Sequence, residues 1–445
     1  SIRLNFAVTG ILFLGTVFLF VYNLQHNIQK IDFDVLGVMR NEQPVPNKNE
    51  ETLWIYDTLP DPAQRAIIKK KENHYPTRLF DPKFTLGLYL STVGKKNTVP
   101  FHWYDWTDLT VLDSAILARP GSKPGCRSFR AFQNELDAFC KDNVSQDMTD
   151  IGVNVFACPS NYMSIDDITT AGLSFLYMNA PNPRKLIFLA NSLTVEIEVA
   201  EKQRMDDSDL IDLVLGGEEL VLVDLSEELA RISKSYSSSM PSGFPTEKEI
   251  PLEAFSFDVQ AKIAELNSDR DGLSSGDKNY LEALEFSEDC RINDRGAKHF
   301  SEPLIKGTNL GLHHDWRFFK KLNTKEYEKR AIIHRLVRTW LDFTAKANIH
   351  TWVAHGSLMA WHWNGLMFPW DDDIDVQVPI EDLHKLARYY NQSLIIEDLN
   401  EGHGRYILDV GAFITERTKG DNKNNIDARF IDIDSGMYID ITALS

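Results

Sequence analysis

The alternation of acidic and apolar residues in Asp373-Ile374-Asp375-Val376 constrains this chain more than any other part of its sequence. Side chains two residues apart on a β-strand lie on the same side, so a strand here presents the carboxylates of Asp373 and Asp375 together. Ile374 and Val376 would then pack into a core behind them. Two hard oxygen ligands at this spacing suit Mg²⁺ or Mn²⁺, the ions that bridge the oxygens of a diphosphate. We therefore expect metal-assisted phosphoryl chemistry at this strand.

The segment His355-Gly356-Ser357 precedes the acidic strand and supplies the second half of the predicted site. Gly356 lacks the Cβ that would block a close approach of the backbone, and a helix capped by Ser357 can direct its first amides at a phosphate. Taken alone, Gly-Ser is commonly just the start of a helix, and a run of aspartates is commonly a solvated loop. A calcium-binding loop fails because Val376 stands where its turn needs Gly. The two segments together favour a metal site.

Apolar spacing predicts the elements around these segments. Asn323 and Glu326 form a capping box ahead of apolar residues at helical spacing, which gives a helix from 323 to about 348. The elements expected after it are a strand at 349–354, a helix at 357–363 ended by Gly365, a strand at 373–378, a helix at 380–390, and a β-hairpin of 429–434 and 437–442. The C-terminal part is therefore expected to be an α/β (α+β) domain.

A third carboxylate should reach the metal from a neighbouring strand, and the hairpin offers two alternatives. Asp440 lies on its second strand, whereas Asp432 and Asp434 lie on its first. If Ser435-Gly436 is a two-residue turn, Asp440 stands across from Ile431 and the other two project to the opposite face. Only one set can meet the metal, and the pattern leaves both open.

The remainder of the chain suggests a membrane-anchored protein. Residues 5–24 form an apolar run without charge, long enough for one membrane span. The expected organisation is a cytosolic tail at 1–4, the anchor at 5–24, a stem at 25–75, a β-rich lumenal domain at 76–305 with a Ser-rich loop at 233–251, and the α/β domain at 306–445. The net charge of −18 argues against nucleic acid as a partner, because phosphate backbones are bound by clustered Lys and Arg.

Three stretches outside the acidic strand can be read in more than one way. The alternating runs at 85–90 and 193–199 predict strands of the β-rich domain. The aromatic group at 102–106 could stack on sugar rings, although core packing is commoner. His313-His314-Asp315 suggests a metal site, but adjacent side chains diverge on a strand, so a structural role is favoured.

Residues 355–375 also resemble a known family. The run from His355-Gly356-Ser357-Leu358 through Trp361, Trp363-Asn364-Gly365 and Pro369-Trp370-Asp371-Asp372-Asp373-Ile374-Asp375 is similar to LicD-type phosphotransferases of the nucleotidyltransferase superfamily. It is most like the fungal proteins required for mannosylphosphate transfer to cell-wall glycans. The resemblance covers about 327–445 and implies a nucleotidyltransferase-like fold. Domains of that family continue beyond the third acidic strand, so we expect the domain to be truncated at Ser445.

The resemblance also implies roles for the site residues and a function. Asp373 and Asp375 would be metal ligands, Asp440 the third acidic residue, and Gly356 and Ser357 part of the donor-phosphate site. The implied protein is a single-pass type II membrane protein of the Golgi that uses GDP-mannose and a divalent metal. It would transfer mannose-1-phosphate to mannose residues of N-linked or O-linked chains on mannan glycoproteins. The alternative is a non-catalytic positive regulator or partner of a separate mannosyl or mannosylphosphate transferase.

Overall fold

The computed structural model describes residues 65–71, 78–113, 164–178, 180–190, 193–234, 249–292, 300, 305, 313–322, 325–365, 367–368, 370–371, 373–411, 413–415 and 426–445. All of them lie in one compact unit, Ala63–Ser445. The predicted tail and anchor at 1–24 and most of the predicted stem lie outside these residues. Within them, no helix combines the length and the apolar character that a membrane span requires.

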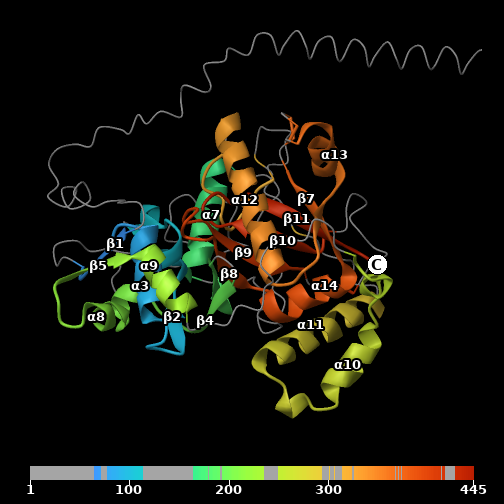
Figure 1. The fold of residues 1–445 in the computed structure, drawn as a ribbon, viewed down its shortest axis with the longest axis horizontal. Coiled ribbons are helices and arrows are strands. Elements are labelled where there is room, and N and C mark those ends of the chain that lie inside the picture. The colour runs from blue at the N-terminus through green and yellow to red at the C-terminus, as the bar shows by residue number, and fades with distance from the viewer. Residues whose placement is uncertain are drawn as a thin grey trace, which may run out of the picture. The chain divides into compact units, whose positions relative to one another are not determined.

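A nine-stranded mixed sheet carries the fold, with strand order β2-β4-β3-β8-β9-β10-β11-β7-β6 (Figure 1). Its strands are β2 (Thr98–Phe101), β3 (Lys185–Ala190), β4 (Leu193–Lys202), β6 (Trp352–Val353), β7 (Asp375–Pro379), β8 (Ser393–Ile396), β9 (Arg405–Val410), β10 (Ala428–Asp432) and β11 (Tyr438–Leu444). The pairs β2/β4, β3/β8 and β7/β11 are parallel and the others are antiparallel. The C-terminal part is therefore mixed α/β, as predicted.

The boundary expected between residues 305 and 306 does not divide the sheet. Strands β2, β3 and β4 come from the predicted middle domain, and β3 pairs directly with β8 of the C-terminal part. The described part of 76–305 is also richer in helix than we expected. Its helices are α3 (Pro82–Thr92), α4 (Trp103–Trp106), α7 (Ile165–Met178), α8 (Leu210–Leu215), α9 (Leu225–Ser233), α10 (Val259–Asn267) and α11 (Ser275–Ile292), with short 3₁₀ turns at Thr110–Leu112, Met205–Asp207, Leu252–Phe255 and Arg270–Gly272. Most of the predicted Ser-rich loop at 233–251 lies outside the described residues.

Two predictions at the start of the unit were wrong. The run at 85–90 is helix α3 instead of a strand, because Asp81 accepts a hydrogen bond from the Lys83 amide at 2.9 Å and Pro82 occupies the first turn. The helix is buried nearly all round, so its sequence lacks a polar face. The end of the predicted stem is strand β1 (Arg65–Lys69), which pairs with β5 (Leu220–Asp224) in a second, two-stranded sheet.

Helices cover both faces of the large sheet. On one face, α12 (Glu326–Lys346) packs across β10 and β11 (Figure 1). Its predicted apolar stripe is buried there, and Trp340 lies 5.5 Å from the ring of Phe430. Helix α14 (Ile380–Lys385) continues into a π-helical turn at Leu386–Tyr390, and this turn packs against α11. Side chains from α3, α4, α7 and residues 316–319 share a core cluster with the other face.

The aromatic group at 102–106 belongs to this second core. Trp103, Tyr104 and Trp106 are buried, and the rings of Phe101 and Trp106 stack with centroids 5.6 Å apart. These rings are therefore not exposed for a sugar, and the core-packing interpretation is confirmed.

Candidate functional site

Asp375 and Asp440 lie side by side on neighbouring parallel strands. They are register partners across β7 and β11, and the Asp440 amide donates to the carbonyl of Ile374 at 3.1 Å. Register partners project from the same face of a sheet. Ile374 and Val376 are buried as predicted, although β7 begins at Asp375, so Asp373 precedes the strand.

The hairpin resolves the choice of the third carboxylate in favour of Asp440. Strands β10 and β11 pair as predicted, but Asp440 stands opposite Arg429 instead of Ile431. The register differs because the connection spans more than a two-residue turn, with Ile433 to Met437 lying between the strands. Asp432 is three residues from Arg429 on β10 and so points to the opposite face of the sheet. It therefore does not meet Asp375.

Helix α13 (His355–Asn364) sits against the start of β7. The N-cap of the helix is Ala354, so Ser357 is not the cap we predicted. The Ser357 hydroxyl instead accepts a hydrogen bond from the Asp375 amide at 3.3 Å. A Cβ at Gly356 would lie 3.0 Å from Oδ2 of Asp371, so glycine permits the close approach of this acidic loop. Gly365 ends the helix at φ +75°, as predicted.

The charge balance at this point favours a cation. Burial, the largest cause, and the neighbouring carboxylates of Asp373 and Asp440 together raise the pKa of Asp375 to about 6, while His355 and His313 oppose the shift. Asp373 and Asp440 thus both disfavour the ionised form of Asp375, and the role of the three carboxylates as metal ligands stays a prediction. Carboxylates that repel one another in this way are stabilised by a positive ion between them.

The sequence suggested a metal site at His313-His314-Asp315 but favoured a structural role, so His313 was not expected beside Asp440. Its Nε2 lies 3.9 Å from Oδ2 of Asp440, and its ring lies 4.3 Å from that of Tyr438. The following residues diverge as we argued, since Asp315 turns away to pair with Arg317 at 2.7 Å. An isolated β-bridge between residues 314 and 437 places this segment beside β11, and no local sequence pattern predicts such a contact.

Arg429 was also missed. Its Nε donates to Oδ1 of Asp440 at 2.8 Å, and its guanidinium lies over the ring of Tyr438 at 3.8 Å. Asp409, Arg429, Asp440 and Asp375 are register partners in turn across β9, β10, β11 and β7. Arg429 thus lies between two aspartates of this row and holds one oxygen of Asp440.

The donor set fits a metal that arrives with a phosphorylated substrate. Within the described residues, no group of three or more His, Cys, Asp or Glu side chains is placed to hold an ion by itself. Asp375 and Asp440 provide two carboxylates, and Mg²⁺ commonly binds one or two carboxylates and completes its shell with water and substrate phosphates. The residues therefore fit an open phosphate-dependent metal site better than a closed protein cage.

Three large aromatic side chains are exposed on α13 and on the loop that follows it. Trp361, Trp363 and Trp370, which we call the tryptophan surface, are 63%, 76% and 59% exposed. Trp370 stacks on Phe368 with centroids 4.9 Å apart and immediately precedes Asp371. Large exposed aromatic side chains are candidates for ligand contacts.

Comparison with known proteins supports the resemblance seen in the sequence. The family described as LicD/FKTN/FKRP, nucleotidyltransferase domain, matches residues 348–443, a range that includes Gly356, Ser357, Asp373, Asp375 and Asp440. The chain is similar to mannosyltransferase regulator 4 of Saccharomyces cerevisiae, with 42% identity over 199 residues, 43% of this chain and 17% of that protein. It is also similar to mannosyltransferase regulator 14 of the same organism, with 43% identity over 207 residues, 44% of this chain and 22% of that protein. The chain thus spans about a fifth of the length of these relatives.

Proposed function

We propose that this protein transfers mannose-1-phosphate from GDP-mannose to mannose residues of N-linked or O-linked glycans, with Mn²⁺ or Mg²⁺. The observation that carries the proposal is that Asp375 and Asp440 lie opposite each other on β7 and β11, beside the start of α13. The family match and the printed names of the two relatives support sugar-phosphate chemistry or its regulation. The sequence further suggests a single-pass Golgi membrane protein that faces the lumen and acts on mannan glycoproteins.

In the proposed reaction a mannose hydroxyl of the acceptor attacks the phosphorus that carries the donor mannose. The new O–P bond replaces the bond to the other phosphate, so GMP leaves and the hydroxyl proton passes to a base. Asp375 and Asp440 would hold a divalent ion, with Asp373 close by, and such an ion would neutralise charge on the diphosphate. Arg429 keeps Asp440 in one orientation, and the first amides of α13 are available to the donor phosphate.

The tryptophan surface supports a saccharide acceptor. Flat aromatic faces bind the apolar faces of sugar rings, and polar residues of the same helix can hydrogen-bond the hydroxyls. Because Trp370 adjoins Asp371, and Gly356 allows this loop to approach α13, a sugar on this surface would lie near the carboxylates. The exposed rings therefore suit the mannose chain that the reaction requires.

A second candidate is a non-catalytic partner that activates a separate mannosylphosphate transferase. It is favoured by the printed names of the relatives and by the engagement of one Asp440 oxygen with Arg429. In this case the acidic pair would shape a docking site without turnover.

The two candidates are separated by measuring GMP release from GDP-mannose with Mn²⁺ and an α-mannotriose acceptor. Turnover that is abolished by Asp375→Asn and kept by Asp212→Asn, an exposed position on α8, supports the enzyme. No turnover, combined with glycan phosphate in cells that needs the protein but survives Asp375→Asn, supports the partner. Turnover that Asp375→Asn leaves intact would exclude the proposed site.

A further inference from the structure

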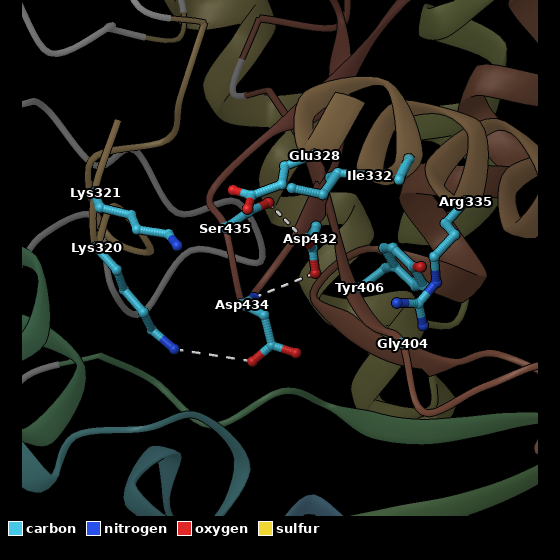
Figure 2. A pocket seen from close by; sticks show the side chains of 11 residues that line it. Lys320, Lys321, Glu328, Ile332, Arg335, Gly404, Tyr406, Asp432, Asp434 and Ser435 are labelled. Carbon is cyan, nitrogen blue, oxygen red and sulfur yellow. Dashed lines mark hydrogen bonds and ion pairs between the residues drawn. The ribbon is translucent and has the colours of Figure 1, made fainter. Parts of the chain in front are cut away.

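A pocket of about 510 Å³ lies on the opposite face of the sheet from Asp375 and Asp440. It is formed by the first half of α12, the loop at 320–321, the start of β9 and the β10–β11 connection (Figure 2). Asp432 and its register partner Tyr406 project into it from the face that carries α12. Its volume is within the range of small-molecule sites. The proposed transferase reaction does not use this pocket.

The two aspartates of the pocket are held in place by partners inside the protein. Asp432 accepts hydrogen bonds from the Ser435 hydroxyl at 2.5 Å and from the Asp434 amide at 3.2 Å. Asp434 pairs with Arg405 and lies 3.8 Å from Nζ of Lys320. Figure 2 shows Lys320 and Lys321 on one side of these carboxylates and Arg335 on the other. Groups fixed in this way bind a ligand without a large ordering cost.

The charges of the lining select against ions. Three cationic side chains face three carboxylates, namely Lys320, Lys321, Arg335, Glu328, Asp432 and Asp434. A phosphate or nucleotide would meet carboxylates at the centre of the pocket, and a cation would have to displace Lys320 or Arg405 from Asp434. A neutral molecule with many hydroxyls satisfies both kinds of group, because each hydroxyl donates to a carboxylate and accepts from Lys or Arg.

We propose that this pocket binds a neutral saccharide, independently of metal and of the Asp375 site. Ile332 and Ala331 supply apolar contacts for the ring carbons, and the fixed carboxylates and cations pair with its hydroxyls. The protein would then hold a glycan on the face of the sheet opposite its candidate reaction site.

The test measures binding of α-mannotriose to the full chain by saturation-transfer NMR and calorimetry, in EDTA and in Mn²⁺. The chain carries Trp361→Ala and Trp363→Ala throughout, so that sugar on the tryptophan surface does not contribute to the signal. We expect the same affinity in both. Ala331→Trp, at an exposed position on α12, should block the pocket. Asp434→Asn should weaken binding by about tenfold or more, the effect of losing one charge-assisted hydrogen bond. His334→Trp, exposed on the same helix outside the pocket lining, is the matched control and should bind normally.

Three results would overturn the inference. Sugar binding that Ala331→Trp and Asp434→Asn leave unchanged would place the saccharide elsewhere. Binding lost in EDTA or in Asp375→Asn would assign the sugar to the proposed transfer site. Binding of GDP or inorganic phosphate that Ala331→Trp abolishes, without sugar binding, would make this an anion site. Because the assay needs no turnover, failure of the proposed transferase function leaves its result unaffected.

Discussion

Asp440 must satisfy both Arg429 and the predicted metal with one carboxylate. Nε of Arg429 donates to Oδ1 of Asp440 at 2.8 Å, while Oδ2 of Asp440 lies 3.9 Å from Nε2 of His313. A carboxylate held through one oxygen keeps a fixed direction for the other, which is how surrounding groups commonly orient a metal ligand. Arg429 is therefore a positioning residue in the proposed site.

We expect Arg429→Met to destabilise the protein. Arg429 is buried beside Asp440, and removing one partner of a buried ion pair typically costs about 3–5 kcal/mol. The free energy of unfolding, measured by urea denaturation, should fall by about this amount. Arg231→Met is the control, because its pair with Glu228 is largely exposed and should be worth at most about 1 kcal/mol. Equal losses in the two variants would contradict the buried role of Arg429.

Asp105 gives a second prediction at the residue scale, on stability and pH. Burial raises its pKa to about 7, although Oδ2 accepts a hydrogen bond from the Met205 amide at 2.8 Å. A folded state that holds the proton more tightly than the unfolded chain is favoured at low pH. The stabilisation of the folded state by protonated Asp105 is complete below about pH 4 and is lost as the pH rises through about 7.

Asp105→Asn should therefore gain stability over the wild type as the pH rises. The difference should be small at pH 4 and reach on the order of 4 kcal/mol at pH 8, since each pKa unit is worth about 1.4 kcal/mol. Urea denaturation at several pH values measures it, with the exposed Asp212→Asn as control. A difference that does not change between pH 4 and pH 8 would show that Asp105 is ionised throughout.

At the scale of elements, α13 has one glycine in its first turn and another at its C-cap, and the two have different roles. Gly365 lies at φ +75° with open space around its Cα, so only its backbone conformation demands glycine. Gly356 is helical, and a Cβ there would press on Asp371 at 3.0 Å.

We expect Gly365→Ala to lower stability by about 1 kcal/mol, because a left-handed conformation is unfavourable for alanine. GMP release should stay normal in that variant. Gly356→Ala should keep normal stability, because alanine favours a helix. It should slow GMP release, because Asp371 must move away from the added Cβ. Thermal unfolding and the donor assay measure the two effects. If both variants lose stability and both keep normal GMP release, the role given to Gly356 is wrong.

The tryptophan surface gives a further prediction for α13. If it binds the acceptor, Trp361→Ala and Trp363→Ala should each raise the KM for α-mannotriose by about tenfold, the typical effect of losing an aromatic contact of about 1–2 kcal/mol. The kcat at saturating acceptor should stay unchanged, because the proposed role of these rings is to bind the acceptor and not to take part in the transfer step. Tyr389→Ala, exposed elsewhere on the molecule, is the control. A fall in kcat without a change in KM would argue against acceptor binding.

Elements with strong local patterns were predicted from the sequence, and those set by tertiary packing were not. The apolar stripe of α12 and the alternation in β7 were sufficient for both elements. α3 was mistaken for a strand because burial on all sides removes the helical period, and only Asp81 and Pro82 indicated the helix. In the site, Asp375 and Ser357 are close in sequence and were predicted together. Arg429 and His313 reach Asp440 through hairpin register and a distant bridge, which no local pattern specifies.

At the scale of the whole molecule, the sheet joins two parts of the chain that the sequence suggested were separate. β3 and β8 pair in parallel, with Leu186 opposite Leu394. Ile396 on β8 belongs to the same core cluster as side chains of α3, α7 and β3. The region matched by the family thus shares its sheet and its core with residues far upstream.

We therefore expect a piece of the chain limited to residues 306–445 not to fold on its own. Without β3, strand β8 becomes an unpaired edge, and the fully buried Leu394 and Ile396 are exposed to water. The piece comprising residues 63–445 keeps these contacts and should unfold in one cooperative transition. Circular dichroism during thermal unfolding compares the two pieces, and amide NMR dispersion checks their packing. A cooperative transition in 306–445 alone would restore the independent C-terminal domain, because it would show that β3 adds little to the stability of β8.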